Sequence, residues 1–263
     1  MPLVFGAICP HPPILIPAIG QKNLKRIKKT QKAMNRLADD FYHASPETVI
    51  IISPHAQMMA ESFIINHSPS LIGDFNDFGD LETKLEFKND LGLAYQIRKA
   101  VETKIPLILT DDQKLDHGSL VPLYYLSQQK KDMAVIPLGY SLLGRDVHYQ
   151  LGQAIKKILN HTNKRVAVIA SGDLSHRLSQ DAPAGFSSKG KEFDKKIIDL
   201  LKNKKHQEIL TLDEELIKDA AECGYRSILI LLGIFDKLNY QTDMLSYECP
   251  FGVGYLVANL EIA

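Results

Sequence analysis

The sequence has no tryptophan, only three cysteines and no excess of either charge. Three scattered cysteines cannot form the disulfide framework of a small secreted protein, so we expect a reducing compartment. Lysine plus arginine and aspartate plus glutamate both number 31, which leaves no electrostatic footprint for nucleic acid. No apolar run approaches the roughly 18 residues of a membrane-spanning helix, and the first residues lack a signal-peptide pattern. We therefore expect a cytoplasmic protein with no nucleic-acid or membrane partner.

The chain does contain short, β-branched apolar runs that alternate with amphipathic segments. The runs predict strands at 3–9, 48–53, 62–67, 105–110, 133–139, 165–171, 240–247 and 252–261. Helical periodicity predicts helices at about 21–43, 91–103, 120–128, 144–160, 187–203 and 224–237. The polar stretch 68–90 is expected to be a long loop or a partly ordered excursion. Apolar strands separated by helices indicate one α/β domain over 1–263, with a central mostly parallel or mixed sheet that helices cover on both faces.

A histidine flanked by prolines follows the first predicted strand. In the stretch CPHPP, His11 lies between Pro10 and Pro12. Proline fixes φ and has no backbone N–H, so this segment neither continues a sheet nor readily begins a helix. The backbone that carries the His11 imidazole is therefore expected to be stiff, which suits a ligand that must not move.

Four of the nine histidines follow predicted strands: His11, His55, His117 and His176. Ligand sites in α/β proteins lie beyond the carboxyl ends of the strands, so four imidazoles delivered there predict one shared pocket. The remaining histidines lie in predicted helices, at helix ends or in polar loops and are expected to be exposed: His43, His67, His148, His161 and His206.

Two kinds of chemistry use such a cluster. Nucleophilic hydrolysis would require a GxSxG elbow, which the sequence lacks. A metal site is favoured, because two neutral imidazoles and one carboxylate suit a non-haem Fe(II) that binds both O2 and an organic substrate. The residues leave four candidates open for the third ligand: Glu222, Cys223, Glu248 and Cys249.

Five motifs, in this order and spacing, carry a family resemblance: CPHPP, SPH, LDHGSLVPL, SGDLSH and ECGYRS. Together they resemble the LigB superfamily of class III extradiol ring-cleavage dioxygenases. Within it the chain looks most like the branch related to Memo proteins and to AmmeMemoRadiSam system protein B. The resemblance covers essentially the whole chain.

The resemblance implies a metal pocket at the carboxyl ends of the strands, with Fe(II) held by His11, His55 and Glu222. The Memo branch has a cysteine in the same segment, which matches Cys223 and is the alternative third ligand. His176 matches the family's catalytic acid/base, and a neutral imidazole suits proton exchange at neutral pH. His117 matches the second histidine of the substrate pocket. Nearby carboxylates commonly orient such rings, and Asp116 and Asp173 are the candidates.

The function implied is that of an oxidoreductase, a non-haem Fe(II)-dependent extradiol-type dioxygenase that opens a catecholic ring with O2. The alternative is a Memo-like metal-binding protein with a redox, interaction or protein-modification-system role and no catechol cleavage, for which Zn or Cu is the alternative metal. A weaker third possibility is a zinc-dependent hydrolase. Residues 68–90 and the C-terminal turn are expected to shape the pocket. Family analogy adds a possible homodimer or a small partner subunit.

Overall fold

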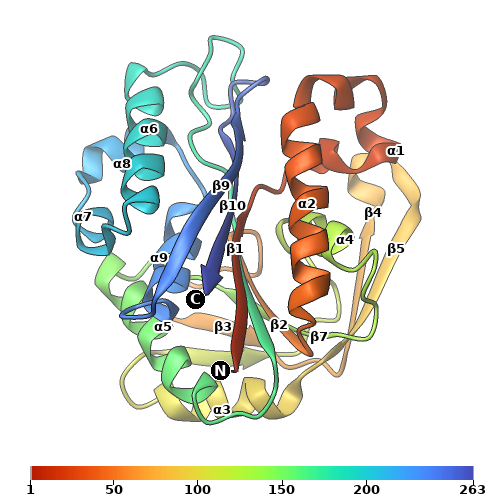
Figure 1. Ribbon diagram of the computed structural model, residues 1–263, viewed down its shortest axis with the longest axis vertical. Coiled ribbons are helices and arrows are strands. Elements are labelled where there is room, and N and C mark those ends of the chain that lie inside the picture. The colour runs from red at the N-terminus through yellow and green to blue at the C-terminus, as the bar shows by residue number, and fades with distance from the viewer. Residues whose placement is uncertain (1, 263) are drawn as a thin grey trace.

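A computed structural model describes residues 2–262 and contains one mixed ten-stranded sheet between two layers of helices (Figure 1). The strands are β1 (Leu3–Cys9), β2 (Thr48–Ser53), β3 (Phe63–Asn66), β4 (Ser70–Phe75), β5 (Asp80–Asn89), β6 (Leu107–Thr110), β7 (Ala134–Gly139), β8 (Val166–Ser171), β9 (Tyr240–Glu248) and β10 (Tyr255–Ile262). The α-helices are α1 (Pro17–Gly20), α2 (Lys28–Ala44), α3 (Leu91–Val101), α4 (His117–Leu126), α5 (Arg145–Leu159), α6 (Ser188–Lys202), α7 (His206–Leu210), α8 (Glu214–Ala220) and α9 (Tyr225–Ile234). Short 3-10 segments are η1 (Pro13–Leu15), η2 (Gln21–Ile27) and η3 (Asn76–Phe78).

The centre of the sheet is parallel, and antiparallel pairs occur toward its borders. Strands follow the order β4-β5-β7-β2-β8-β1-β10-β9, in which β7, β2, β8 and β1 run parallel to one another. Strands β10 and β9 close one border as an antiparallel pair. The other side divides at β7, because its first residues pair with β5 and its last residues pair with β3. The carboxyl ends of β1, β8 and β2 therefore lie side by side.

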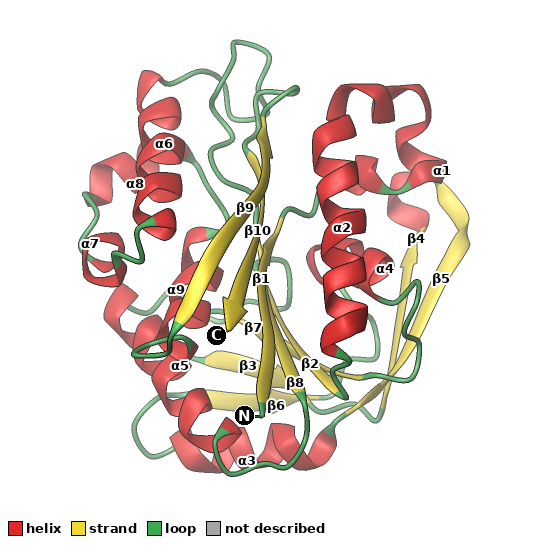
Figure 2. Cartoon of the chain, viewed as in Figure 1, coloured by secondary structure: helices red, strands yellow, loops and turns green. Residues whose placement is uncertain are grey.

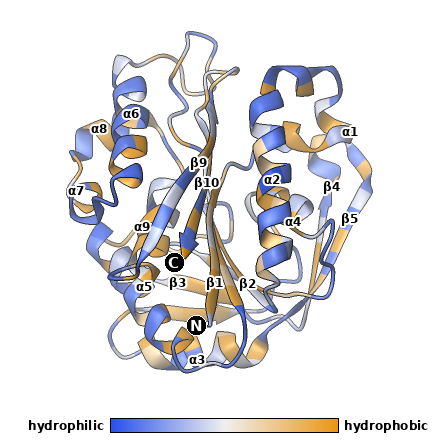
Figure 3. Ribbon diagram, viewed as in Figure 1, coloured by the Kyte–Doolittle hydropathy of each residue, from blue (hydrophilic) through white to orange (hydrophobic). Residues whose placement is uncertain are grey.

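Successive side chains along the central strands point to opposite faces of the sheet, so the core has two layers. In β2, Ile50 and Ile52 face one apolar cluster, whereas Val49 and Ile51 face the other. Helices α3 and α5–α9 cover the first face, and α2 and α4 cover the second (Figure 2). Hydrophobic colour is concentrated in the sheet and on the inner sides of the helices (Figure 3). This arrangement confirms the expected α/β sheet with helices on both faces.

Helix α9 is apolar around most of its circumference because it is buried among α5, β8 and α7. A helix that is hydrophobic all round belongs either in a core or in a membrane. With only ten residues, α9 is far shorter than a bilayer-spanning helix. Between residues 2 and 262, no helix combines the length and the apolar character needed to cross a membrane.

The expectation of an irregular segment at 68–90 is wrong. This segment forms the antiparallel hairpin of β4 and β5, which η3 connects. Leu71, Phe75 and Phe87 are buried against α4 and its neighbours. Most charged residues between them face solvent, whereas Asp80 is buried. A strand pair with one solvated face needs few apolar residues, so the polar composition concealed the alternation.

The helical regions also differ from the expectation in detail. The helix expected at 21–43 is α2, which begins at Lys28, and η2 precedes it. Gln21 has a φ of 43°, so the chain turns there rather than entering a helix directly. The short helices α7 and α8 were not predicted, since each is shorter than the window over which helical periodicity is recognisable.

Candidate metal centre

Two histidine rings meet beyond the carboxyl ends of neighbouring strands. His11 lies two residues after β1, and His55 lies two residues after β2. Because β8 separates these strands in the sheet, both loops turn over its end. The two Nε2 atoms are 3.1 Å apart. The structure thus brings together the two imidazoles that the sequence placed at strand ends.

Cys223 reaches the same point from the start of α9. Its backbone N–H and that of Gly224 both donate to the Asp173 carbonyl, directly after β8. The Cys223 Sγ lies 3.6 Å from the His11 Nε2. One potential ligand atom from each of His11, His55 and Cys223 lies within 4.8 Å of the other two.

The donor set fits a single metal ion. Metal–nitrogen bonds of about 2.0–2.1 Å and metal–sulfur bonds of about 2.3 Å place two nitrogens about 3.4 Å apart, and nitrogen and sulfur about 3.6 Å apart, in a tetrahedral site. The observed separations of 3.1 Å and 3.6 Å agree with these values. Three protein donors also leave a coordination position for a small molecule, as catalytic sites require.

A chain of hydrogen bonds determines which nitrogen of His11 is free. The Ser171 hydroxyl at the end of β8 donates its proton to the Gly118 carbonyl at 2.5 Å. It is 2.9 Å from the His11 Nδ1, and with its own proton already donated it accepts from an Nδ1–H. The Nε2 lone pair is therefore left to face His55 and Cys223, which is the tautomer that a metal ligand needs.

His11 is buried and His55 is exposed at its outer edge, and the loss of water around each ring favours the neutral form. Burial lowers the pKa of His11 well below the usual value, and the neighbouring His55, His117 and His176 lower it further. The pKa of His55 is lowered by burial and by His117, while Asp116 opposes the shift. Neutral imidazole is the form that binds a metal ion. For Cys223, burial raises the pKa of the thiol, so the free thiol is protonated and metal binding would release a proton.

The other three candidates for the third ligand lie elsewhere. The Glu222 carboxylate accepts the Tyr225 N–H at 2.5 Å at the start of α9, and burial raises its pKa to about 7. Glu248 accepts from the backbone N–H and the hydroxyl of Thr30 at 2.7 Å each. Cys249 is exposed. Among residues 2–262, the donor group around His11 and His55 includes Cys223 and none of these three.

His117 and His176 lie beside the cluster. His117 begins α4, and its ring centroid is 4.2 Å from that of His55 and 5.6 Å from that of His11. His176 has its Nε2 3.9 Å from the Asp173 Oδ2, and both residues group with Cys223 as potential donors. Burial lowers the pKa of His117 and of His176, so both are neutral proton acceptors.

The sequence predicted that Asp116 and Asp173 orient the histidine rings, but their hydrogen bonds go to other groups. Asp116 accepts from the Ser53 hydroxyl at 2.5 Å and from the Ser119 N–H at 3.0 Å, so it ties the end of β2 to the start of α4. Asp173 accepts the backbone N–H of His11 at 3.0 Å. Both carboxylates thus fix the backbone near the histidines rather than hydrogen-bonding to their rings.

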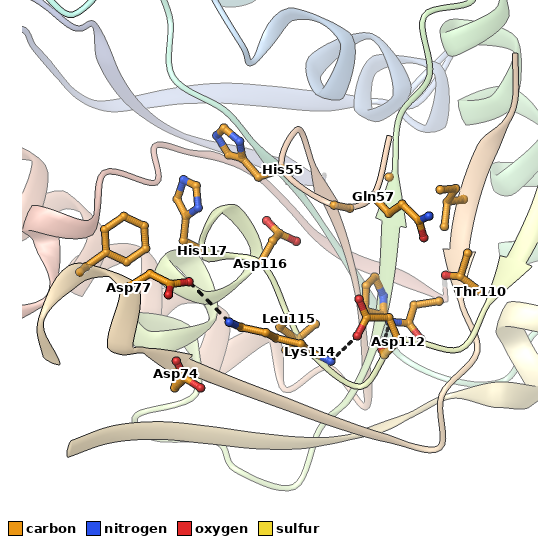
Figure 4. A pocket seen from close by; sticks show the side chains of 16 residues that line it. His55, Gln57, Asp74, Asp77, Thr110, Asp112, Lys114, Leu115, Asp116 and His117 are labelled. Carbon is orange, nitrogen blue, oxygen red and sulfur yellow. Dashed lines mark hydrogen bonds and ion pairs between the residues drawn. The ribbon is translucent and has the colours of Figure 1, made fainter. Parts of the chain in front are cut away.

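A cavity of about 300 Å³ adjoins the histidines (Figure 4). His55 and His117 form one side of it, and Phe78 packs on His117 with ring centroids 5.1 Å apart. Other residues in its wall are Gln57, Asn66, Asp74, Asp77, Thr110, Asp112, Lys114 and Asp116. The hairpin at 68–90 contributes Asp74, Asp77 and Phe78, as the sequence led us to expect for the pocket wall.

Several of these residues carried no recognisable signal in the sequence. Phe78 and Lys114 lie in irregular polar stretches, and only the tertiary fold brings them to the histidines. Ser171 could have been noticed, since it is a polar residue at the end of an otherwise apolar strand.

Of the histidines expected to be exposed, His43 and His161 are exposed, and His67 and His206 are half-buried. The expectation is wrong for His148, which is fully buried between the carbonyls of Ser141 and Gly144.

Comparison with known proteins places this site in a family. Residues 6–258 match the family described as the catalytic LigB subunit of aromatic ring-opening dioxygenase. Protein CA_C1420 of Clostridium acetobutylicum is 33% identical over 97% of this chain and 56% of its own length. The 3,4-dihydroxyphenylacetate 2,3-dioxygenase of Escherichia coli is 35% identical over 32% of each chain. A MEMO1 family protein of Sulfolobus acidocaldarius is 25% identical over 80% of this chain and 69% of its own.

The chain spans about half the length of CA_C1420, and the match to the dioxygenase covers about a third of either protein. Among solved structures, an uncharacterized Escherichia coli K12 protein, JW3007, superimposes with a TM-score of 0.71 over 97% of this chain and 99% of that one. At 15% identity this likeness concerns the fold alone. The match over residues 6–258 spans nearly all of the sheet and every residue of the candidate metal centre. The chain therefore belongs to the LigB family of aromatic ring-opening dioxygenase subunits.

Proposed function

We propose that this chain is a metal-dependent oxidoreductase that uses O2 to open a catecholic ring, with its metal ion bound by His11, His55 and Cys223. The observation that carries the proposal is the cluster of two imidazoles and one sulfur beside a cavity of about 300 Å³. A volume of this order suits one small aromatic ring and its substituents. Iron(II) is the proposed metal, because it supports O2 chemistry at sites with open positions.

The choice of Cys223 over Glu222 rests on position. The sulfur faces the His11 Nε2, whereas the Glu222 carboxylate accepts an N–H of α9 and lies near Arg226. A ligand set with a thiolate remains compatible with iron but also suits copper and zinc. Glu222 as a ligand stays a prediction from the family resemblance.

The remaining histidines have roles as proton carriers and positioning groups. We assign His176 to accept a proton from a catechol hydroxyl, since burial keeps its ring neutral at pH 7. His117 faces the cavity beside His55 and is placed to donate a hydrogen bond to the bound substrate or to O2. A bound redox-active metal would supply Lewis acidity and electron transfer between substrate and O2.

A second function is favoured by one specific observation, the cysteine in the cluster. A soft thiolate donor selects copper(I) and zinc over harder ions. The alternative proposal is therefore a Memo-like metal-binding protein with a redox role and no ring cleavage. The two proposals share the ligands and differ in whether the cavity accepts a catechol.

The test is O2 consumption by protein that is purified without O2 and loaded with iron(II), in the presence of catechols. Metal affinity is measured on the same protein. We expect Cys223→Ser to lose metal binding and Glu222→Gln to retain the affinity of the unsubstituted protein. Glutamine keeps an oxygen for the Tyr225 N–H, so Glu222→Gln is the matched control. For His176→Ala we expect metal binding to persist and catechol-dependent O2 uptake to fall by at least about 100-fold.

Each other outcome has a clear meaning. Tight metal binding without catechol-dependent O2 uptake would replace ring cleavage with the Memo-like redox role. Loss of metal in Glu222→Gln but not in Cys223→Ser would return Glu222 to the ligand set. Absence of binding for iron, copper and zinc alike would overturn both proposals.

A further inference from the structure

The cavity beside the metal centre has an acidic wall. Its charged residues are four aspartates and one lysine, apart from the neutral histidines: Asp74, Asp77, Asp112, Asp116 and Lys114. Figure 4 places His55 and His117 at the upper side of the cavity and Asp74 and Asp112 at the lower side. A group that extends from the metal centre into the cavity therefore meets carboxylates.

Only part of this negative charge is compensated within the protein. Lys114 places its Nζ 3.5 Å from Asp77, in an ion pair that is well exposed. Asp116 receives hydrogen bonds from Ser53 and Ser119. No ion pair formed within residues 2–262 involves Asp74 or Asp112.

The existing contacts of the two aspartates leave part of each carboxylate free. One oxygen of Asp74 accepts the Asn76 N–H at 3.0 Å, and one oxygen of Asp112 accepts the Lys114 N–H at 2.9 Å. The second oxygen of each has no hydrogen-bond donor assigned to it within the described chain. A wall of this kind attracts a cation and repels an anion.

We propose that the substrate of this site is a catechol whose side chain carries a positive charge, such as a primary ammonium group. The proposal rests on the proposed function and names its substrate class. Relatives of the chain are named for 3,4-dihydroxyphenylacetate and 2,3-dihydroxyphenylpropionate, both of which carry a carboxylate. Here that carboxylate would face the Asp74 and Asp112 carboxylates.

Phe78 supports the same inference from another direction. Its ring lines the cavity and packs edge-to-face against His117, with centroids 5.1 Å apart. Aromatic faces attract organic cations as well as aromatic rings. Asp74, Asp77 and Phe78 all belong to the β4–β5 hairpin region, so this hairpin is the element that determines the charge preference.

The experiment measures dissociation constants by calorimetry without O2, on iron(II)-loaded protein, for three catechols that differ in side-chain charge. These probes are 3,4-dihydroxyphenethylamine, neutral 4-methylcatechol and 3,4-dihydroxyphenylacetate. We expect the amine to bind about tenfold or more tightly than the carboxylate at low salt, with a smaller difference at high salt because exposed charges are screened.

Four variants locate the effect. Asp74→Asn and Asp112→Asn retain an oxygen for the turn hydrogen bonds and should each reduce the preference roughly threefold. Lys114→Gln removes the lysine of the wall and should increase the preference. Asp132→Asn is the control, because it removes one carboxylate near the opposite, amino end of β7 and should change nothing. Urea denaturation of each variant shows whether it keeps its fold.

The outcomes separate this inference from the proposed function. Equal binding of the amine and the carboxylate, or tighter binding of the carboxylate, overturns the charge preference and leaves ring cleavage standing. A preference that survives both Asp74→Asn and Asp112→Asn overturns the assignment to this wall. If none of the three catechols binds, both the substrate class and the proposed function fall together.

Discussion

At the scale of single residues, the Ser171 hydroxyl determines which ring nitrogen of His11 carries the proton and which is free to bind a metal ion. Ser171 donates to the Gly118 carbonyl and therefore accepts from the His11 Nδ1. Its exposed fraction is zero, so no water competes for this position. Groups that orient metal-binding histidines in this way typically contribute 10–100-fold to affinity or activity.

We predict that Ser171→Ala weakens metal binding about 10–100-fold while the protein stays folded. The Nδ1–H loses its acceptor, so the imidazole is free to rotate or to change tautomer. Competition with a metallochromic chelator measures the change in affinity. Ser227→Ala is the matched control, because this buried hydroxyl has no hydrogen-bond partner in the described chain and its loss should leave affinity unchanged.

A second residue-scale prediction concerns the pH dependence of stability at Asp194. Burial raises the pKa of this carboxyl to about 6, although Tyr247 and Ser175 donate hydrogen bonds to it. The folded state thus holds the proton to higher pH than the unfolded chain, whose aspartates titrate near pH 4. The contribution of Asp194 to the free energy of unfolding is complete below about pH 4 and is lost as the pH rises through about 6.

Asparagine is neutral at every pH, so Asp194→Asn should gain stability relative to the unsubstituted protein as the pH rises. We expect the difference in free energy of unfolding to increase by about 1–3 kcal/mol between pH 4.5 and pH 7. Urea denaturation at both pH values gives this difference. A constant difference, or one that shrinks with pH, would show that Asp194 is ionised in the folded protein.

At the scale of secondary-structure elements, a contact between two glycines positions the cysteine. A Cβ on Gly172, just after β8, would lie 2.1 Å from the Gly224 Cα at the start of α9. Only a residue without a side chain lets the helix approach the strand end so closely. Cys223 precedes Gly224, so this contact determines how near its sulfur comes to His11.

We predict that Gly172→Ala displaces the start of α9 and weakens metal binding by at least about tenfold. The added methyl group overpacks the contact and should lower the free energy of unfolding by about 1–3 kcal/mol. Metal titration and urea denaturation measure the two effects separately. In contrast, Gly92→Ala in α3 meets nothing closer than 3.8 Å and should raise stability by up to about 1 kcal/mol, without affecting metal binding. Unchanged metal affinity in Gly172→Ala would contradict this account of Cys223.

At the scale of the whole molecule, the proposed metal joins segments that are far apart in the sequence. His11 follows β1, His55 follows β2 and Cys223 precedes α9, so one ion connects both ends of the chain to its early middle. The unfolded chain offers no such preformed set of ligands. Binding free energy therefore adds to the stability of the folded protein.

We predict that iron(II) or zinc raises the melting temperature by an amount that increases with the logarithm of the free metal concentration divided by the dissociation constant. A free metal concentration 100 times the dissociation constant adds about 2.7 kcal/mol, which corresponds to about 5–10 °C for a domain of this size. Differential scanning calorimetry without O2, with and without chelator, measures the shift. Cys223→Ser should abolish it, while Cys249→Ser should retain it because that thiol is exposed and outside the cluster. Equal shifts in both variants would disprove ligation by Cys223.

Much of the fold was predictable because it depends on local pattern. Strands β1, β2 and β8 are buried on both faces and appear as continuous apolar runs, and α5 and α6 show strong helical periodicity. The β4–β5 hairpin was not predictable in the same way. Its outer face is charged, and its inner residues are recognisable as core only when α4 packs on them.

The candidate site likewise has some features that follow from local sequence and others that depend on the tertiary structure. The sequence by itself determined that His11 and His55 follow strands, that prolines stiffen the loop of His11, and that the chain resembles the LigB superfamily. The tertiary structure decided which of Glu222 and Cys223 faces the histidines. Adjacent residues point in different directions at a helix start, and the approach of Gly224 to Gly172 sets that direction. The acidic wall is likewise a tertiary property, since it forms only where the β4–β5 hairpin meets the segment before α4.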